Sequence, residues 1–221
     1  MFDLDNTLVH SRIDFRSLRQ ALIEALWSSG ATSATAEGLM RHPIPELILI
    51  GEAHERAQGG ALTASMWEMV LEYETAGMAV ATIEEGAGDV LERLRGRGHP
   101  LAVLTNNARP ATLEALEKFA LRPYFDLVVT RDDVPALKPA PDGVRHAMSW
   151  FAARTTRTLV IGDSWIDGAA ARGAGATFLA FQPRPNDLES RGVHPVGVVQ
   201  RLQDLELLDL PGLAAPRPDR A

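Results

Sequence analysis

The stretch that decides the fold is MFDLDNTL, residues 1–8, where two acids stand one residue apart after an apolar start. A strand over these residues would direct Asp3 and Asp5 to the same side, because side chains alternate along a strand. At the carboxyl end of a strand in an open α/β sheet, both acids would face the crevice in which such sheets bind ligands. The stretch therefore predicts an acidic ligand site at the start of the chain.

The chemistry of such a site follows from the repulsion between the two acids. Carboxylates this close repel each other unless a cation or a shared proton relieves them, and a hard divalent cation, Mg²⁺ above all, prefers oxygen ligands. A carboxylate in that position can attack phosphorus, since aspartyl-phosphates are established covalent intermediates. The plainer alternative is a polar turn after an edge strand, with residues 5–7 capping the next helix.

Composition narrows the class of protein. The chain has 221 residues, 46% hydrophobic and 23% charged, as in one large or two modest globular domains. A net charge of -7 argues against a nucleic-acid partner bound through bulk charge. The absence of cysteine excludes disulfides, thiolate metal sites and cysteine nucleophiles. Without a signal peptide or a membrane-length apolar run, we expect a cytoplasmic protein with no membrane partner.

Residues 10–80 are predicted to be helical throughout, with no strand. Apolar residues at three- and four-residue steps predict helices over 14–28, 45–57 and 61–75.

From residue 81 onward the sequence pattern changes and predicts strands that alternate with helices. Strands are predicted over 100–104, 125–130, 158–161, 177–181 and 196–199. Helices are predicted over 88–97, 110–119, 141–153, 166–172 and from about 200 to 208. This alternation predicts an α/β fold, a Rossmann-like, mostly parallel sheet with helices on both faces.

The helical block interrupts the α/β part directly after its first strand. We therefore expect a core of residues 1–9 and 81–221 and an all-helical cap domain of residues 10–80, hinged at the two chain crossings. Residues 211–221 are rich in Pro and Arg and are expected to form a flexible tail.

Polar residues cluster at or just beyond the ends of three later strands. A hydroxyl and free backbone N–H groups at Thr105 and Asn106 suit a phosphate. Lys138, in a loop before a helix, can neutralise a phosphoryl oxygen and a nucleophilic carboxylate together. Asp163 and Asp167 add two further carboxylates. Each has a plainer interpretation as a helix cap or a solvated lysine, but the ordered set around one parallel sheet indicates phosphoryl transfer.

Four segments together resemble the haloacid dehalogenase-like (HAD) hydrolase superfamily. FDLDNT at 2–7, LAVLTNN at 101–107, Lys138-Pro139 and VIGDSWID at 160–167 match its four motifs in order. The helical insert is similar to that superfamily's first type of cap domain.

The resemblance implies a role for each matching residue. Asp3 would be the nucleophile that becomes an aspartyl-phosphate, and Asp5 would protonate the leaving oxygen and then activate water. Thr105, the Asn106 amide and Lys138 would hold the transferring phosphoryl group.

The resemblance also implies a Mg²⁺ site. Its ligands would be the Asp3 carboxylate, the Asp5 backbone carbonyl and Asp163, with Asp167 near the ion or reaching it through water.

Two residues bear on the reaction type. True dehalogenases of the superfamily lack an acid where Asp5 stands, and some phosphosugar mutases carry Val where Thr7 stands, so a phosphatase is favoured. TLVHS at 7–11 resembles phosphoglycolate phosphatases, with His10 in place of their usual Asp, which makes 2-phosphoglycolate a candidate substrate. The alternatives are a phosphosugar mutase on the same scaffold or a non-catalytic binding protein that retains the fold.

The implied partner is a small phosphorylated metabolite, and the chain would act as a monomer or a homodimer. One feature departs from the superfamily, because only Met1 and Phe2 precede Asp3 where a central strand of five to six residues is typical. We therefore expect first-strand residues upstream of Met1.

Overall fold

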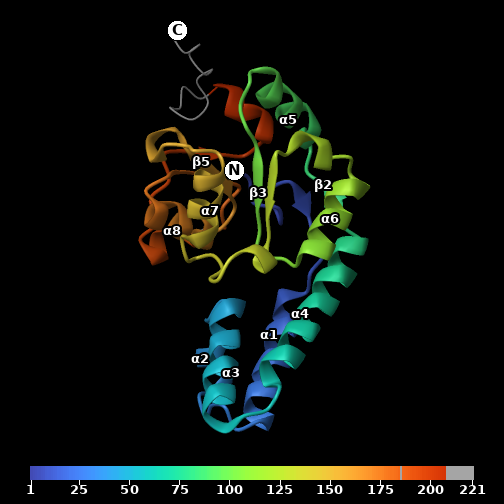
Figure 1. Ribbon diagram of the computed structural model, residues 1–221, viewed down its shortest axis with the longest axis vertical. Helices are drawn as coiled ribbons and strands as arrows, with labels where there is room; N and C mark the ends of the chain where they lie inside the picture. Colours follow the sequence, from blue (N-terminus) through green and yellow to red (C-terminus); the bar gives the residue numbers. More distant parts are fainter. Residues whose placement is uncertain (185, 208–221) are drawn as a thin grey trace. The chain divides into compact units, whose positions relative to one another are not determined.

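The computed structural model describes residues 1–184 and 186–207, and the chain separates into two compact units. One unit comprises Met1–Ser11 with Ala81–Ala221 and is mixed α/β, and the other, Arg12–Val80, is helical (Figure 1). Within the described residues, no helix has both the length and the apolarity needed to cross a membrane.

The centre of the α/β unit is a parallel sheet organised around Phe2. β3 (Ala102–Leu104) pairs with β4 (Leu127–Val129), and β5 (Leu159–Gly162) pairs with β6 (Thr177–Phe181), which pairs with β7 (Val198–Val199). Phe2 lies between β3 and β5 and forms parallel bridges to Val103 and Ile161. The order is therefore β4, β3, residue 2, β5, β6, β7, and the predicted α/β fold with a parallel sheet is confirmed.

The opening strand is shorter than the alternation argument predicted. After Asp3 the chain turns, and the carbonyl oxygen of Leu4 accepts hydrogen bonds from the backbone N–H groups of Leu8 and Val9. Asn6 sits at φ 56° in the left-handed region, which asparagine tolerates better than most residues. The prediction that one strand carries both acids is therefore wrong, because the turn begins between Asp3 and Asp5.

Helices cover both faces of the sheet (Figure 1). α7 (Asp142–Trp150) and α8 (Trp165–Ala174) pack on one face, and α5 (Ala87–Gly96) and α6 (Arg109–Lys118) lie on the other. On the first face Val144 of α7 and Ala170 of α8 belong to one buried cluster with Leu104, Val160 and Phe178. Each such Val or Leu contributes about 1.5–3 kcal/mol through burial.

Short 3₁₀ segments connect these elements. They are η1 (Arg122–Tyr124), η2 (Arg131–Asp133), η3 (Thr155–Arg157), η4 (Glu189–Arg191) and η5 (Leu202–Leu207). η5 lies where a last helix was predicted, and the structure shows that this helix is a 3₁₀ helix. Leu202 and Leu205 are both buried, and a spacing of three residues aligns side chains along a 3₁₀ helix. Residue 208 and the predicted tail, 211–221, lie outside the described residues.

The helical unit contains α1 (Phe15–Ser28), α2 (Ala36–Leu39), α3 (Ile44–Gln58) and α4 (Leu62–Ala79). Asp14 caps α1, and its carboxylate accepts a 3.0 Å hydrogen bond from the Ser17 N–H. The core of the unit is apolar, and its fully buried members include Leu18, Leu22 and Leu26 of α1, Leu47 of α3 and Met66 of α4.

α4 continues past its predicted end at residue 75 because of a close approach at Gly77. A Cβ atom on Gly77 would lie 2.5 Å from Ile13 Cγ1, so the absence of a side chain permits this contact. The Gly77 carbonyl also accepts a hydrogen bond from the Arg12 N–H. The part of α4 beyond residue 75 therefore makes tertiary contacts that the local apolar pattern does not reveal.

The two chain crossings of the α/β unit pair with each other. β1 (Val9–His10) runs antiparallel to β2 (Thr82–Ile83), and an ion pair joins His10 to the buried Glu84. The prediction that residues 10–80 contain no strand is wrong at His10. Strands of two residues show no periodicity, so only the pairing partner reveals them.

Candidate active site

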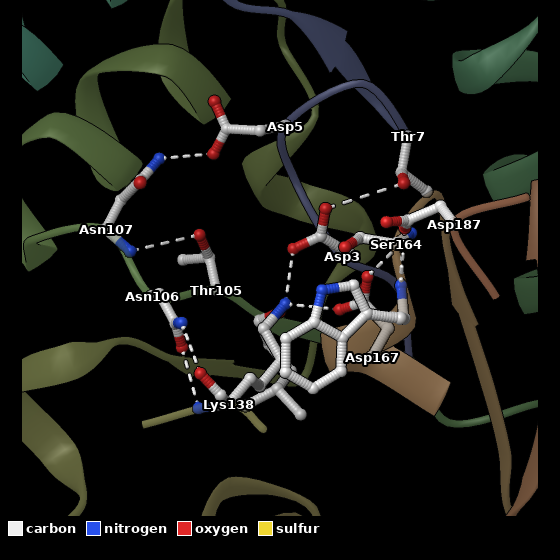
Figure 2. Close-up of polar contacts among 12 residues, drawn as sticks. Asp3, Asp5, Thr7, Thr105, Asn106, Asn107, Lys138, Ser164, Asp167 and Asp187 are labelled. Carbon is white, nitrogen blue, oxygen red and sulfur yellow. Dashed lines mark hydrogen bonds and ion pairs between the residues drawn. The ribbon is translucent and has the colours of Figure 1, made fainter. Parts of the chain in front are cut away.

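Lys138 is the centre of a buried polar cluster (Figure 2). Its Nζ donates to Asp3 Oδ1 at 2.5 Å, to Asp167 Oδ1 at 2.6 Å and to the Leu104 carbonyl at 2.9 Å. Burial by itself disfavours the charged amine, but the two carboxylates outweigh it and raise the pKa of Lys138 above its ordinary value. The lysine therefore stays positively charged beside the predicted nucleophile.

Asn106 holds the backbone of this lysine in place. Its Oδ1 accepts from the Lys138 N–H, and its Nδ2 donates to the Lys138 carbonyl, each at 2.9 Å. This reciprocal pair joins the end of β3 to the loop before α7. The Asn106 side chain is thus engaged, which leaves its backbone N–H for the phosphate contact that the sequence predicts.

Three acids meet beside the lysine. One carboxylate oxygen from each of Asp3, Asp163 and Asp167 lies within 4.8 Å of the others. Burial raises the pKa of Asp3 well above its usual range, although Lys138 opposes the shift. Burial and, to a smaller extent, the negative charge of Asp167 raise the pKa of Asp163 to about 7. A bound cation would relieve these penalties, so the oxygen-only donor set fits a metal ion.

The three acids are not equally available to a metal. Asp167 accepts from Lys138 with Oδ1 and from the Ser164 N–H with Oδ2 at 3.2 Å. Asp3 Oδ2 has only a long contact of 3.5 Å with the Thr7 hydroxyl among the described residues. Asp3 and Asp163 therefore have oxygen atoms to offer, and Asp167 mainly positions Lys138.

Asp5 points away from this acidic group toward Asn107 (Figure 2). The Asn107 side-chain N–H donates to Asp5 Oδ2 at 2.5 Å. Burial raises the pKa of Asp5, while the Ser11 hydroxyl and the Asn107 amide partly lower it. Neither Asp5 Oδ1 nor the Ser11 hydroxyl has a hydrogen-bond partner of acceptable geometry in the part of the chain that the structure describes. A buried carboxyl with a raised pKa suits proton transfer near neutral pH.

Thr105 is buried at the end of β3. Its hydroxyl oxygen accepts a 3.2 Å hydrogen bond from the Asn107 N–H, and its own N–H donates to the Val129 carbonyl in β4. The hydroxyl hydrogen can therefore donate to an anion. Thr105 occupies the strand end at which the sequence placed a phosphate contact.

The structure thus brings together the side chains of Asp3, Lys138, Asp163 and Asp167, as their order along the chain predicted, whereas the Asp5 side chain lies apart. Sequence reasoning missed the side-chain bond from Asn107 to Asp5, the Asn106 contact with the Lys138 backbone and the proximity of Ser11. Asn107 belongs to the quoted LAVLTNN segment, but its bond to Asp5 spans 102 positions and leaves no local pattern.

Comparison with known proteins identifies the class of protein. A family profile described as haloacid dehalogenase-like hydrolase matches residues 1–181. A phosphoglycolate phosphatase from Cereibacter sphaeroides (strain ATCC 17025 / ATH 2.4.3) is 33% identical over 188 residues, covering 82% of this chain and 83% of that protein. A haloacid dehalogenase-like hydrolase from Bacteroides fragilis aligns with a TM-score of 0.68 and 20% identity, over 92% of this chain and 97% of that one.

A third match is the HAD hydrolase YfnB from Bacillus subtilis, whose structure was solved with bound magnesium. It aligns with a TM-score of 0.60 and 21% identity, over 95% of this chain and 97% of that one. The chain belongs to the haloacid dehalogenase-like hydrolase family. The predicted family and hydrolase class are therefore confirmed.

Proposed function

We propose that the chain is a Mg²⁺-dependent phosphatase that hydrolyses a small phosphorylated metabolite through an aspartyl-phosphate on Asp3. The observation that carries this proposal is the charged Lys138 bonded to both Asp3 and Asp167 beside Asp163. A buried cation positions a transferring phosphoryl group and neutralises part of its charge, and a buried acidic cluster can hold a metal ion that neutralises more of it.

In the first step a carboxylate oxygen of Asp3 attacks phosphorus. Lys138 holds Asp3 Oδ1, which fixes the orientation of the carboxylate, and its charge stabilises the negative oxygens of the phosphoryl group. The Thr105 hydroxyl and the Asn106 backbone N–H donate to the same oxygens. These groups supply binding that strengthens as charge builds in the transition state.

Proton transfer belongs to Asp5. In its protonated form it gives its hydrogen to the leaving oxygen, and as a carboxylate it then removes a proton from the water that cleaves the aspartyl-phosphate. The raised pKa of Asp5, caused by burial, keeps a protonated fraction available.

The metal would be held by the Asp3 carboxylate, the Asp5 backbone carbonyl and Asp163, with Asp167 beside it. When bound, Mg²⁺ supplies positive charge to the phosphoryl oxygens and offsets the repulsion among the acids. The magnesium reported for the Bacillus subtilis relative supports this choice of ion.

We propose 2-phosphoglycolate as the candidate substrate and the helical unit, Arg12–Val80, as a cap domain. The support for the substrate is the name of the Cereibacter relative, and the support for the cap is the insertion of a separate helical unit between Ser11 and Ala81. Such insertions exclude water during the reaction when they close.

The deciding experiment measures phosphate release from a panel of phosphorylated metabolites with Mg²⁺, for the parent chain and for Asp3→Asn. Glu92→Gln, which changes an exposed acid on α5 to an amide, is the matched control. We expect release by the parent and the control and none by Asp3→Asn. Equal release by Asp3→Asn would contradict the role of Asp3, and phosphate transfer within a sugar phosphate without release would indicate a mutase.

A further inference from the structure

Two backbone hydrogen bonds hold Asn107 in place independently of the bond between its side chain and Asp5. The residue is buried, its backbone N–H donates to Thr105 Oγ1, and its carbonyl accepts from the Arg131 N–H at 3.1 Å. Its side chain is thus presented from a rigid junction between the ends of β3 and β4. From there it donates to Asp5 Oδ2 at 2.5 Å, across the site from Lys138 (Figure 2).

The two oxygens of Asp5 are therefore unequal. Oδ2 accepts the amide hydrogen of Asn107, whereas Oδ1 is buried with no hydrogen-bond partner of acceptable geometry among the described residues, and the Ser11 hydroxyl lies close to the Asp5 carboxyl. An amide N–H can only donate, so Oδ2 must remain an acceptor in both protonation states of Asp5. When Asp5 carries a proton, that proton sits on Oδ1.

We propose that Asn107 is a positioning residue for proton transfer, which holds Asp5 through Oδ2 and thereby makes Oδ1 the oxygen that exchanges protons with the substrate. The inference rests on the phosphatase function proposed above and adds to it an assignment of atoms. It also explains why the end of β3 carries two asparagines, one for the Lys138 backbone and one for Asp5.

The proton moves as follows in each half of the reaction. An Asp3 oxygen bonds to phosphorus while the bond from phosphorus to the ester oxygen breaks, and the Oδ1 hydrogen of Asp5 passes to that oxygen, which leaves as an alcohol. Water then attacks the aspartyl-phosphate, gives one proton to Asp5 Oδ1, and the bond between phosphorus and Asp3 breaks to release phosphate. Asn107 stays bonded to Oδ2 throughout.

The test compares two phosphate esters that differ in their need for a proton. An alkyl phosphate leaves as a basic alkoxide and needs an acid, whereas p-nitrophenyl phosphate leaves as a stable anion and needs little help. We would measure kcat/KM, which reports formation of the aspartyl-phosphate, for the parent, Asn107→Leu and Asn107→Ala. Leucine retains much of the side-chain volume of asparagine without a donor.

We expect Asn107→Leu to lower kcat/KM for the alkyl ester at least about tenfold more than for p-nitrophenyl phosphate. In an Asp5→Asn background, Asn107→Leu should cause no further change in the ratio of the two rates, because the acid through which it acts is gone. Asn107→Ala covers the case in which leucine disturbs folding, which thermal unfolding would reveal.

Asp133→Asn is the structural control, since it weakens a hydrogen-bonded cap at the end of the neighbouring strand and should leave the ratio unchanged. Equal loss on both esters in the Asn107 variants, or no loss on either, would overturn the assignment while leaving the phosphatase function intact. Absence of phosphate release by the parent from every ester would instead overturn the phosphatase function, and this assignment with it.

Discussion

In two clusters of acid and base at neighbouring strand ends, the pKa of the acid shifts in opposite directions. In the active-site cluster, Asp3 lies against Lys138, and burial still raises the pKa of Asp3. In the cap cluster that follows β4, Asp133 lies against Arg109 and also accepts from the Thr130 N–H and hydroxyl at 2.7 and 2.6 Å. There burial is outweighed by these hydrogen bonds, and the pKa of Asp133 is lowered.

The difference distinguishes an ion pair that stabilises a turn from one that suits the proposed reaction. Asp133 is half-buried and has enough donors, so its negative charge is satisfied and stabilises the turn into η2. Asp3, Asp163 and Asp167 share one lysine, so their charges exceed what the protein neutralises. The unneutralised negative charge can attract a metal ion.

The largest expected effect comes from removing each cation. Lys138→Met leaves Asp3 and Asp167 buried without their partner, so we expect the metal-free chain to lose about 3–5 kcal/mol of unfolding free energy and phosphate release to disappear. Arg109→Met should lose about 1 kcal/mol and keep its activity, because Asp133 retains its bonds to Thr130 and partial solvent contact. Urea denaturation with a phosphate assay checks both. Equal losses in the two variants would abolish the distinction between the clusters.

Replacing an acid by its amide should change the unfolding free energy in opposite directions in the two clusters, with a gain for Asp163→Asn and a loss for Asp133→Asn. Asp163→Asn removes a carboxylate whose pKa burial raises to about 7, so the metal-free chain should gain about 1–3 kcal/mol of unfolding free energy at pH 8. The same variant should lose the stabilisation that Mg²⁺ gives the parent. Thermal unfolding with EDTA and with Mg²⁺ measures both quantities. A destabilised metal-free Asp163→Asn would show that this acid is satisfied within the protein.

The pH dependence of the unfolding free energy provides a further test of the active-site cluster. Between about pH 4 and 7 the folded chain retains the Asp163 proton that the unfolded chain has lost, so this group makes metal-free stability fall as pH rises. We expect the fall to be weaker in Asp163→Asn and to be reversed by Mg²⁺, whose binding displaces the proton. Unfolding curves from pH 5 to 8 provide the measurement, and identical slopes for the parent and Asp163→Asn would contradict it.

The smallest expected effect concerns the cap cluster. Asp133→Asn weakens the capping box that Asp133 forms with Thr130 at the start of η2. We expect a loss of about 0.5–2 kcal/mol of unfolding free energy at pH 7. Because the folded pKa of Asp133 is lowered, its contribution is present above the unfolded pKa of about 3.9 and disappears as pH falls through the folded value. The difference between the parent and the variant in urea denaturation should therefore shrink as the pH is lowered from 7 through the folded pKa of Asp133. A difference that stays the same at every pH would assign the effect to packing.

From the sequence, the class of fold could be predicted correctly, and the residues of the candidate site could be proposed. The alternation of apolar strands with amphipathic helices from residue 81 onward predicted the parallel sheet, since each pattern has its own period. Polar residues at successive strand ends predicted that Asp3, Lys138 and Asp167 would converge, because carboxyl ends of parallel strands share one edge. Residue order along the chain is sufficient for both conclusions.

Tertiary structure alone decided the finer arrangement. The turn after Asp3, the pairing of β1 with β2 and the extension of α4 at Gly77 all depend on contacts with distant residues. So do the pKa values of the two acids, because burial raises the pKa of Asp3, whereas hydrogen bonds from Arg109 and Thr130 lower that of Asp133. The bond from Asn107 to Asp5 belongs here too, since it joins two loops that only the folded sheet brings within hydrogen-bonding distance.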